Sequence, residues 1–192
     1  MRKGKIFTVQ LKRRKEGRTN YKKRLKELLS NKCRIVIRKS LKNLHVSITE
    51  YCEKGDKVLF TINSKALTKF GWKGDTGNLS SAYLVGLLAG KKALEQGIKD
   101  AILDIGVNKS VRGSRLYAAV AGAIDSGIKI PVDLKVLPSK ERISGEHISK
   151  YARLLKDDNL KLSRQFSNYF KREINPEEVV NHFNEVKIKI NG

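Results

Sequence analysis

The sequence contains few of the residues that mark several large classes of protein. Its 192 residues include only two cysteines, one tryptophan, three histidines and three prolines. Cys33 and Cys52 lack the spacing of a metal site, so they predict reduced thiols in a cytosolic protein. A disulfide joining the ends of a hairpin is the alternative. A disulfide-rich secreted scaffold is excluded.

The chain also lacks a long hydrophobic run. Its longest apolar stretch, from Ala82 to Ala89, is far shorter than the roughly 20 residues that cross a bilayer. The charged N-terminus is not followed by an apolar run of about 7–15 residues, which argues against a secretory signal. A mitochondrial transit peptide is a weak alternative, because the opening is rich in lysine rather than serine. We therefore expect a cytoplasmic protein without membrane contact.

Acidic residues are scarce at the N-terminal end. The first 43 residues carry seventeen Lys or Arg but only two acids, Glu16 and Glu27, which gives +15 of the chain's net +22. This charge cannot be balanced within the fold, and nucleic acid is the obvious external polyanion, since neutralising phosphates releases condensed counterions. A nonspecific DNA-compacting protein would carry similar charge, so charge alone does not select the nucleic acid.

The signals that would indicate an enzyme are incomplete. The run Gly86–Lys91 is one residue short of a P-loop and lies inside a predicted helix. The histidines are isolated, without a cysteine or histidine partner at metal-ligand spacing. Asp104 could be a nuclease carboxylate, but Glu50, Asp56 and Asp125 form no compact motif with it. We expect no catalysis, cofactor or metal; an RNA enzyme remains a rival that would depend on Asp104.

The hydrophobic pattern divides the chain into a basic arm with a short helix at 1–30, an α/β core at 31–138 and a helical extension at 139–192. Helical spacing predicts a helix from Tyr21 to Leu29, capped by Thr19 or Asn20. We expect the arm to be disordered until it binds RNA, because its own sequence cannot offset the entropy of ordering.

The core pattern predicts strands at 34–38, 44–48 and 57–62, a helix at 78–96, a buried strand at 101–105, a helix at 114–126 and a short last strand at 132–137. This order implies a mixed sheet with helices on its faces, a three-layer α/β fold. Gly86, Gly90 and Ala93 share one helix face and allow a close backbone approach.

Beyond Pro138 the periodicity is purely helical. It predicts helices at 143–155 and 160–170 and a third that begins at Asn175, where Asn caps and Pro occupies the first turn. These helices are too short for an independent domain, so we expect them to dock as a tail.

Two loops lead into helix N-termini and combine glycine with basic residues. Gly71–Asn78 suits close contact with an anion, and Trp72 either stacks on an unpaired base or packs on the core. Asn108–Arg115 suits phosphate binding, with a solvated basic loop as the alternative. Arg34 and Arg38 share one face of the first strand, where rigid cations could position an RNA backbone.

The predicted RNA contacts come from four segments. They are Lys12, Arg13, Arg14, Lys15, Arg18, Tyr21, Lys22 and Arg24 of the arm and its helix; Arg34, Arg38, Lys39 and Lys42 of the first hairpin; Trp72, Lys73 and Asn78 of the first loop; and Lys109, Arg112 and Arg115 of the second.

Five motifs in register resemble one family. They are Lys15-Glu-Gly-Arg-Thr-Asn-Tyr21 with Arg24-Leu25, Phe70-Gly-Trp-Lys-Gly-Asp-Thr-Gly-Asn78, Ala82-Tyr-Leu-Val-Gly-Leu-Leu-Ala-Gly90, Ile102-Leu-Asp-Ile-Gly106 and Ser144-Gly-Glu-His-Ile148. Together they resemble the large-subunit ribosomal protein eighteen family, the universal 5S rRNA binder, in its archaeal form with a helical extension.

The resemblance implies an RNase-H-like core of the translational-machinery type, without catalysis. It further implies binding to 5S rRNA and to the large-subunit rRNA in the central protuberance, beside neighbouring large-subunit ribosomal proteins and not on DNA. It selects 5S rRNA where charge alone could not. The helical tail should then meet a ribosomal neighbour or the main rRNA, and its removal should leave 5S rRNA affinity largely intact. The chain departs from the family pattern at Asn20, where an acid is common, and at Asn108-Lys-Ser-Val.

Overall fold

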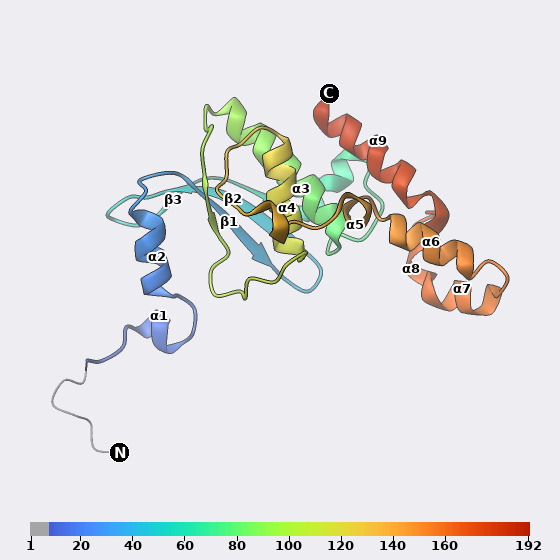
Figure 1. The fold of residues 1–192 in the computed structure, drawn as a ribbon, viewed down its shortest axis with the longest axis horizontal. Helices are drawn as coiled ribbons and strands as arrows, with labels where there is room; N and C mark the ends of the chain where they lie inside the picture. The colour runs from blue at the N-terminus through green and yellow to red at the C-terminus, as the bar shows by residue number, and fades with distance from the viewer. Residues whose placement is uncertain (1–7) are drawn as a thin grey trace, which may run out of the picture.

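The structure is a computed structural model that describes residues 8–192 (Figure 1). Predictions for residues 1–7, including the start of the predicted arm, lie outside the described residues. The described chain begins with two short helices, α1 (Lys12–Lys15) and α2 (Tyr21–Leu28). Asn20 rather than Thr19 caps α2, since its side chain accepts a hydrogen bond from the backbone N of Lys23 at 3.1 Å.

A four-stranded mixed sheet forms the centre of the fold, with strand order β3-β2-β1-β4. The strands are β1 (Arg34–Lys39), β2 (Leu44–Glu50), β3 (Lys57–Asn63) and β4 (Ile102–Asp104). The first three pair as the predicted antiparallel meander, and β4 pairs with β1 in parallel. Alternation places Ile35 and Ile37 in the core and turns Arg34 and Arg38 to the opposite face.

Two helices cover the apolar face of the sheet. They are α3 (Leu79–Glu95), capped by Asn78, and α4 (Arg115–Asp125). The predicted close approach is present: a Cβ at Gly86 would overlap the backbone of Ala119 in α4. On the opposite face α2 approaches the start of β1 through ion pairs, so helical elements lie on both sides of the sheet.

The C-terminal region is helical, as predicted, but more broken. It contains α5 (Lys140–Ser144), α6 (Glu146–Leu154), α7 (Asn159–Gln165), α8 (Ser167–Phe170) and α9 (Val179–Asn191). The expected single helix at 143–155 is interrupted at Gly145, whose φ of +85° is left-handed. Short 3₁₀ turns occupy Ser64–Phe70 and Pro176–Glu178.

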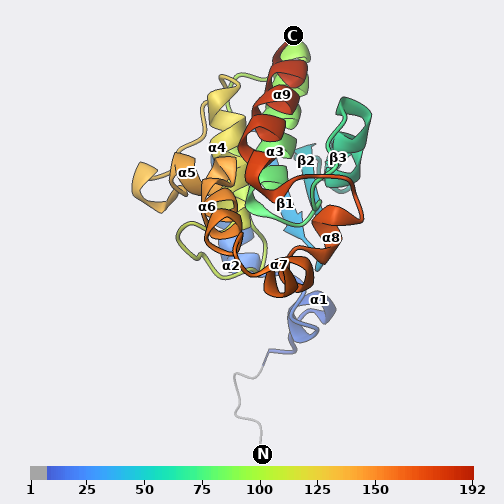
Figure 2. The ribbon, with the colours of Figure 1, turned by 90° about the vertical axis from the view of Figure 1, so that its right-hand side faces the viewer.

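The last helix belongs to the main core. Phe183, Val186 and Ile190 of α9 are buried in the same cluster as the sheet and α3. Figure 2 shows α9 lying along α3, and the Tyr83 and Phe183 rings meet at 5.7 Å between centroids. Helices α6, α7 and α8 lie at the end of the molecule opposite α1 and α2 (Figure 1). The predicted docking of the tail is thus confirmed, chiefly through α9.

The predicted strand at 132–137 is wrong. Leu134–Val136 forms a 3₁₀ turn, and the Asp133 side chain accepts a hydrogen bond from the backbone N of Lys135 at 2.9 Å. In place of a fifth strand beside β4, the described residues contain one isolated parallel bridge, between Asp100 and Lys129. An Asp that caps its own following turn competes with sheet pairing, which explains the difference.

Cys33 and Cys52 are free, as the reduced-thiol reading predicts. Within residues 8–192, no helix combines the length and hydrophobicity needed to span a membrane.

Candidate nucleic-acid interface

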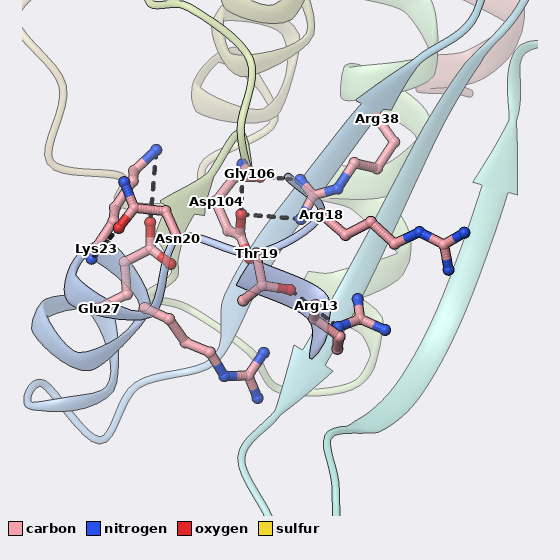
Figure 3. A pocket seen from close by; sticks show the side chains of 10 residues that line it. Arg13, Arg18, Thr19, Asn20, Lys23, Glu27, Arg38, Asp104 and Gly106 are labelled. Atoms are coloured by element: carbon pink, nitrogen blue, oxygen red, sulfur yellow. Dashed lines mark hydrogen bonds and ion pairs between the residues drawn. The ribbon is translucent and has the colours of Figure 1, made fainter. Parts of the chain in front are cut away.

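Basic side chains from the N-terminal helices and the sheet surround a cavity of about 130 Å³, which we call the arm cavity (Figure 3). Helices α1 and α2 supply its outer wall, while β1 and the end of β4 supply the inner wall. Its lining contains five cations and two carboxylates. The lining residues are Arg13, Arg18, Thr19, Asn20, Lys23, Arg24, Glu27, Arg38, Asp104 and Gly106.

An ion-pair network fixes α2 against the sheet below this cavity. Asp56, in the turn between β2 and β3, accepts two hydrogen bonds of 2.9 Å from Arg24 of α2. The same carboxylate lies 2.7 Å from the Nη2 atom of Arg34, whose side chain is only 1% exposed. One carboxylate therefore connects an exposed helix to a buried strand residue.

The protonation of Asp56 is controlled by these partners. Burial alone would raise the pKa of its carboxyl, but hydrogen bonds and positive charge from Arg34 and Arg24 outweigh burial and lower that pKa. Asp56 therefore stays ionised through the neutral range. A charged link of this kind orients α2, whose own residues are all at least partly exposed.

Asp104 holds the second strand arginine. Its Oδ1 atom accepts a hydrogen bond from Arg38 at 3.0 Å and one from the backbone N of Gly106 at 2.7 Å. Arg34 reaches its other oxygen at 3.5 Å. Asp56 and Asp104, two of the four acids considered for nuclease chemistry, are thus paired with arginines and position basic side chains.

The predicted loops meet around Arg115. This side chain donates hydrogen bonds to the carbonyl oxygens of Gly77, Leu41 and Ser40, so it ties the β1–β2 turn to the loop before α3. Thr76 adds a 2.8 Å hydrogen bond to the carbonyl oxygen of Lys42. The structure therefore brings the first hairpin and the two predicted loops together. The Arg115 guanidinium, however, donates its hydrogen bonds to these backbone carbonyls and not to solvent.

Trp72 does not offer the base-stacking surface considered for it. Its side chain is 3% exposed and stacks on His182 of α9, with ring centroids 5.1 Å apart and planes 14° apart. His182 also accepts a hydrogen bond from the backbone N of Lys73 at 3.1 Å, and burial lowers the pKa of its imidazole. The core-packing reading of Trp72 is the one that the structure supports.

The remaining predicted residues divide by exposure. Arg34 is buried and held by its ion pairs. The side-chain oxygen of Asn78 accepts a hydrogen bond from Ser81 N at 2.8 Å and caps α3. Neither side chain is therefore available for the RNA contact that was predicted for it. Tyr21, Arg24 and Arg38 are partly exposed. The exposed members are Lys12, Arg13, Arg14, Lys15, Arg18, Lys22, Lys39, Lys42, Lys73, Lys109 and Arg112.

Sequence reasoning missed the acidic part of the cavity. Lys23 and Glu27 lie one helical turn apart on α2, with Nζ and Oε1 3.7 Å apart, and both line the arm cavity. A signal was available, because Glu27 is one of only two acids among the first 43 residues. An acid retained in so basic a segment indicates a specific position rather than a solvated surface.

Comparison with known proteins identifies the family. A family model described as "Ribosomal large subunit proteins 60S L5, and 50S L18" matches residues 5–101. Over 191 residues, 99% of this chain and 97% of the relative, the chain is 47% identical to "Large ribosomal subunit protein uL18" of Thermofilum pendens. The chain belongs to this ribosomal protein family. The fold described above, a mixed sheet with C-terminal helices, agrees with that membership, which also marks the chain as a ribosomal component rather than an enzyme.

Proposed function

We propose that the protein binds 5S rRNA and helps attach it to the large-subunit rRNA in the central protuberance of the cytoplasmic ribosome. The observation that carries this proposal is the arm cavity, where cations from α1, α2 and β1 converge in a member of a large-subunit ribosomal protein family. Large-subunit membership supplies the RNA context, and the cavity supplies a place for the phosphate backbone.

The proposed contacts fall into a flexible and a fixed set. The exposed cations of α1 follow the RNA backbone and provide affinity, since phosphate neutralisation is largely independent of sequence. Arg38 is held by Asp104 while its side chain stays 44% exposed, so it presents a fixed cation. Exposed Lys39 and Lys42 at the β1–β2 turn, and exposed Lys109 and Arg112 in the second loop, add further cations for the RNA backbone.

Helices α5 to α8 (residues 140–170), which we call the C-terminal lobe, support a separate contact with the subunit. Tyr151, Leu154, Leu160 and Phe170, all on α6–α8, are between 45% and 79% exposed. Exposed apolar side chains close together often mark an interaction surface. We propose that this lobe meets a neighbouring ribosomal protein or the large-subunit rRNA, at the end opposite the arm cavity.

A titration over a salt series with magnesium tests the function. The protein should bind 5S rRNA more tightly than transfer RNA or duplex DNA, with a log–log salt slope of about −5 to −8. That slope corresponds to about seven to nine phosphate contacts. Equal affinity for all three nucleic acids at moderate salt would refute specific 5S binding and favour a nonspecific polyanion binder.

A further inference from the structure

The loop before α3 and the last helix are joined at one histidine. We call residues 71–78 the Trp72 loop; its indole stacks on the imidazole of His182 in α9, with planes 14° apart. The backbone N–H of Lys73 donates a hydrogen bond of 3.1 Å to the Nε2 atom of the same imidazole. Among residues 8–192, this is the only hydrogen bond between the Trp72 loop and α9. His182 therefore holds the loop through both a ring contact and a backbone contact.

The indole is also fixed within its own loop. Its Nε1–H donates a hydrogen bond of 3.3 Å to the carbonyl oxygen of Asp75. A Cβ at Gly74 would overlap the indole ring, so the loop backbone lies directly against Trp72. The indole and its loop therefore form one unit, and a contact that holds the ring holds the loop.

The Trp72 loop connects α9 to a turn that is proposed to meet RNA. Thr76 donates a hydrogen bond of 2.8 Å to the carbonyl oxygen of Lys42 in the β1–β2 turn. The carbonyl oxygen of Gly77 accepts a hydrogen bond from Arg115, which also reaches the carbonyl oxygen of Leu41. The docked C-terminal helix and the basic β1–β2 turn thus share one connecting segment.

The hydrogen bond from Lys73 requires a neutral imidazole. Nε2 is the acceptor, so the one proton of the neutral ring is on Nδ1. A second proton on Nε2 would place two N–H groups against each other, and the bond would be lost. The charge on His182 therefore decides whether the backbone contact exists.

The surroundings of His182 favour the neutral ring. Burial lowers the pKa of its imidazole from the ordinary 6.5; Glu185 opposes this shift, while Lys73 and Lys189 reinforce it. The ring is therefore neutral above about pH 6.5, and it becomes charged as pH falls through the lower folded-state value. The charged residues around this site come from the loop, the segment before α9 and α9 itself: Lys73, Glu173, Glu178, Glu185 and Lys189.

We propose that His182 is a positioning residue and a pH-sensitive switch: its neutral imidazole holds the Trp72 loop on α9, and its protonation releases the loop while α9 stays docked. Helix α9 stays because Phe183, Val186 and Ile190 are buried in the core independently of His182. The inference goes beyond RNA binding and does not depend on it, because the switch operates in the free protein.

Nuclear magnetic resonance of the full ¹⁵N-labelled chain without RNA tests the switch between about pH 7.5 and pH 5. The imidazole nitrogen signals report the protonation of His182. Hydrogen exchange of the Lys73 amide, divided by its intrinsic rate at each pH, reports the hydrogen bond. As His182 becomes protonated, protection of the Lys73 amide should fall about fivefold or more, the effect of one lost hydrogen bond. Amides in the buried part of α9 should keep their protection.

Three variants assign the effect to the imidazole. His182→Gln supplies an acceptor oxygen that does not titrate, so protection of the Lys73 amide should be retained in part and should not depend on pH. His182→Phe keeps a ring for Trp72 but has no acceptor, so protection should be low at both pH values. His45→Phe, which changes a histidine on β2, is the control and should leave the pH dependence unchanged.

Two results for the unmodified protein would overturn the inference: full protection of the Lys73 amide after His182 is protonated, or an imidazole that stays neutral down to about pH 5. A fall in protection over the same pH range in His182→Gln would assign the change to another group, with the same consequence. Failure of the proposed function is seen separately, since a protein without preference for 5S rRNA would still give the expected exchange pattern.

Discussion

The two ends of the described chain are attached to the sheet by different forces. Helix α9 buries Val179, Phe183, Val186 and Ile190, and three of these belong to the main core. Helices α1 and α2 bury no residue, and the contact of α2 with the sheet depends on the charged Arg24–Asp56–Arg34 link. The C-terminal end is thus part of the hydrophobic core, whereas the N-terminal helices remain at the surface and α2 is held there by ion pairs.

This difference revises the expected role of the C-terminal extension. Its removal was expected to leave RNA affinity largely intact. Cutting the chain after residue 138 would remove α9 and open the core, so RNA binding and folding would be lost together. Variants within the helices, rather than truncations, can separate the two.

The largest expected effect is on the folded end. Phe183→Ala removes a side chain that is 4% exposed, and we expect the free energy of unfolding to fall by about 3 kcal/mol. Urea denaturation followed by circular dichroism measures this. Ile188→Ala is the matched control, since this side chain on the same helix is 70% exposed. Similar losses for the two variants would show that α9 is not docked as described.

A smaller loss is expected from the charged link. Asp56→Asn leaves the buried Arg34 with Asp104 alone, 3.5 Å away, and we expect a loss of about 2 kcal/mol. Because the folded-state pKa of Asp56 is lowered, its stabilisation is present above the unfolded value near 3.8 and is lost as pH falls through the folded value. The difference between wild type and variant should therefore shrink below about pH 4.

Denaturation at pH 7 and at pH 3 measures this dependence. Asp157→Asn, which changes an exposed acid in the C-terminal lobe, serves as control and should have little effect at either pH. A pH-independent loss in Asp56→Asn would contradict an electrostatic origin for the link.

The smallest expected effect on stability comes from α1. Replacing Lys12, Arg13, Arg14 and Lys15 together by alanine should leave unfolding within about 0.5 kcal/mol, because none of them is buried. Affinity for 5S rRNA should fall about tenfold or more, and the salt slope should become shallower by about 2–3. Binding measured across a salt series reports both quantities.

A control variant removes the same number of charges from the other end. Lys140, Arg153, Lys156 and Lys161 are exposed in the C-terminal lobe, and alanine at all four should change 5S affinity much less. Equal losses from the two quadruple variants would mean that net charge, rather than the location of the arm, determines binding.

The fold was largely predictable because hydrophobic period and caps act locally. The alternation through Ile35 and Ile37 predicted β1, and Asn78 and Asn175 marked helical starts that the structure confirms. The 132–137 run failed because Asp133 caps its own turn, a local competition that an apolar pattern does not reveal.

The site was less predictable because exposure is a tertiary property. Arg34 and Arg38 stand four residues apart on one face of one strand, yet the first is buried and the second is not. Their difference comes from Asp56 and Asp104, which lie 22 and 66 or more residues away along the chain. The burial of Trp72 likewise depends on stacking with His182, a residue more than one hundred positions later in the chain.

The position of Trp72 has a practical consequence. As the only tryptophan of the chain, it gives the protein a single indole fluorophore, located where the loop before α3 meets α9. Its emission therefore monitors the seating of the last helix, and it does so independently of the arm cavity.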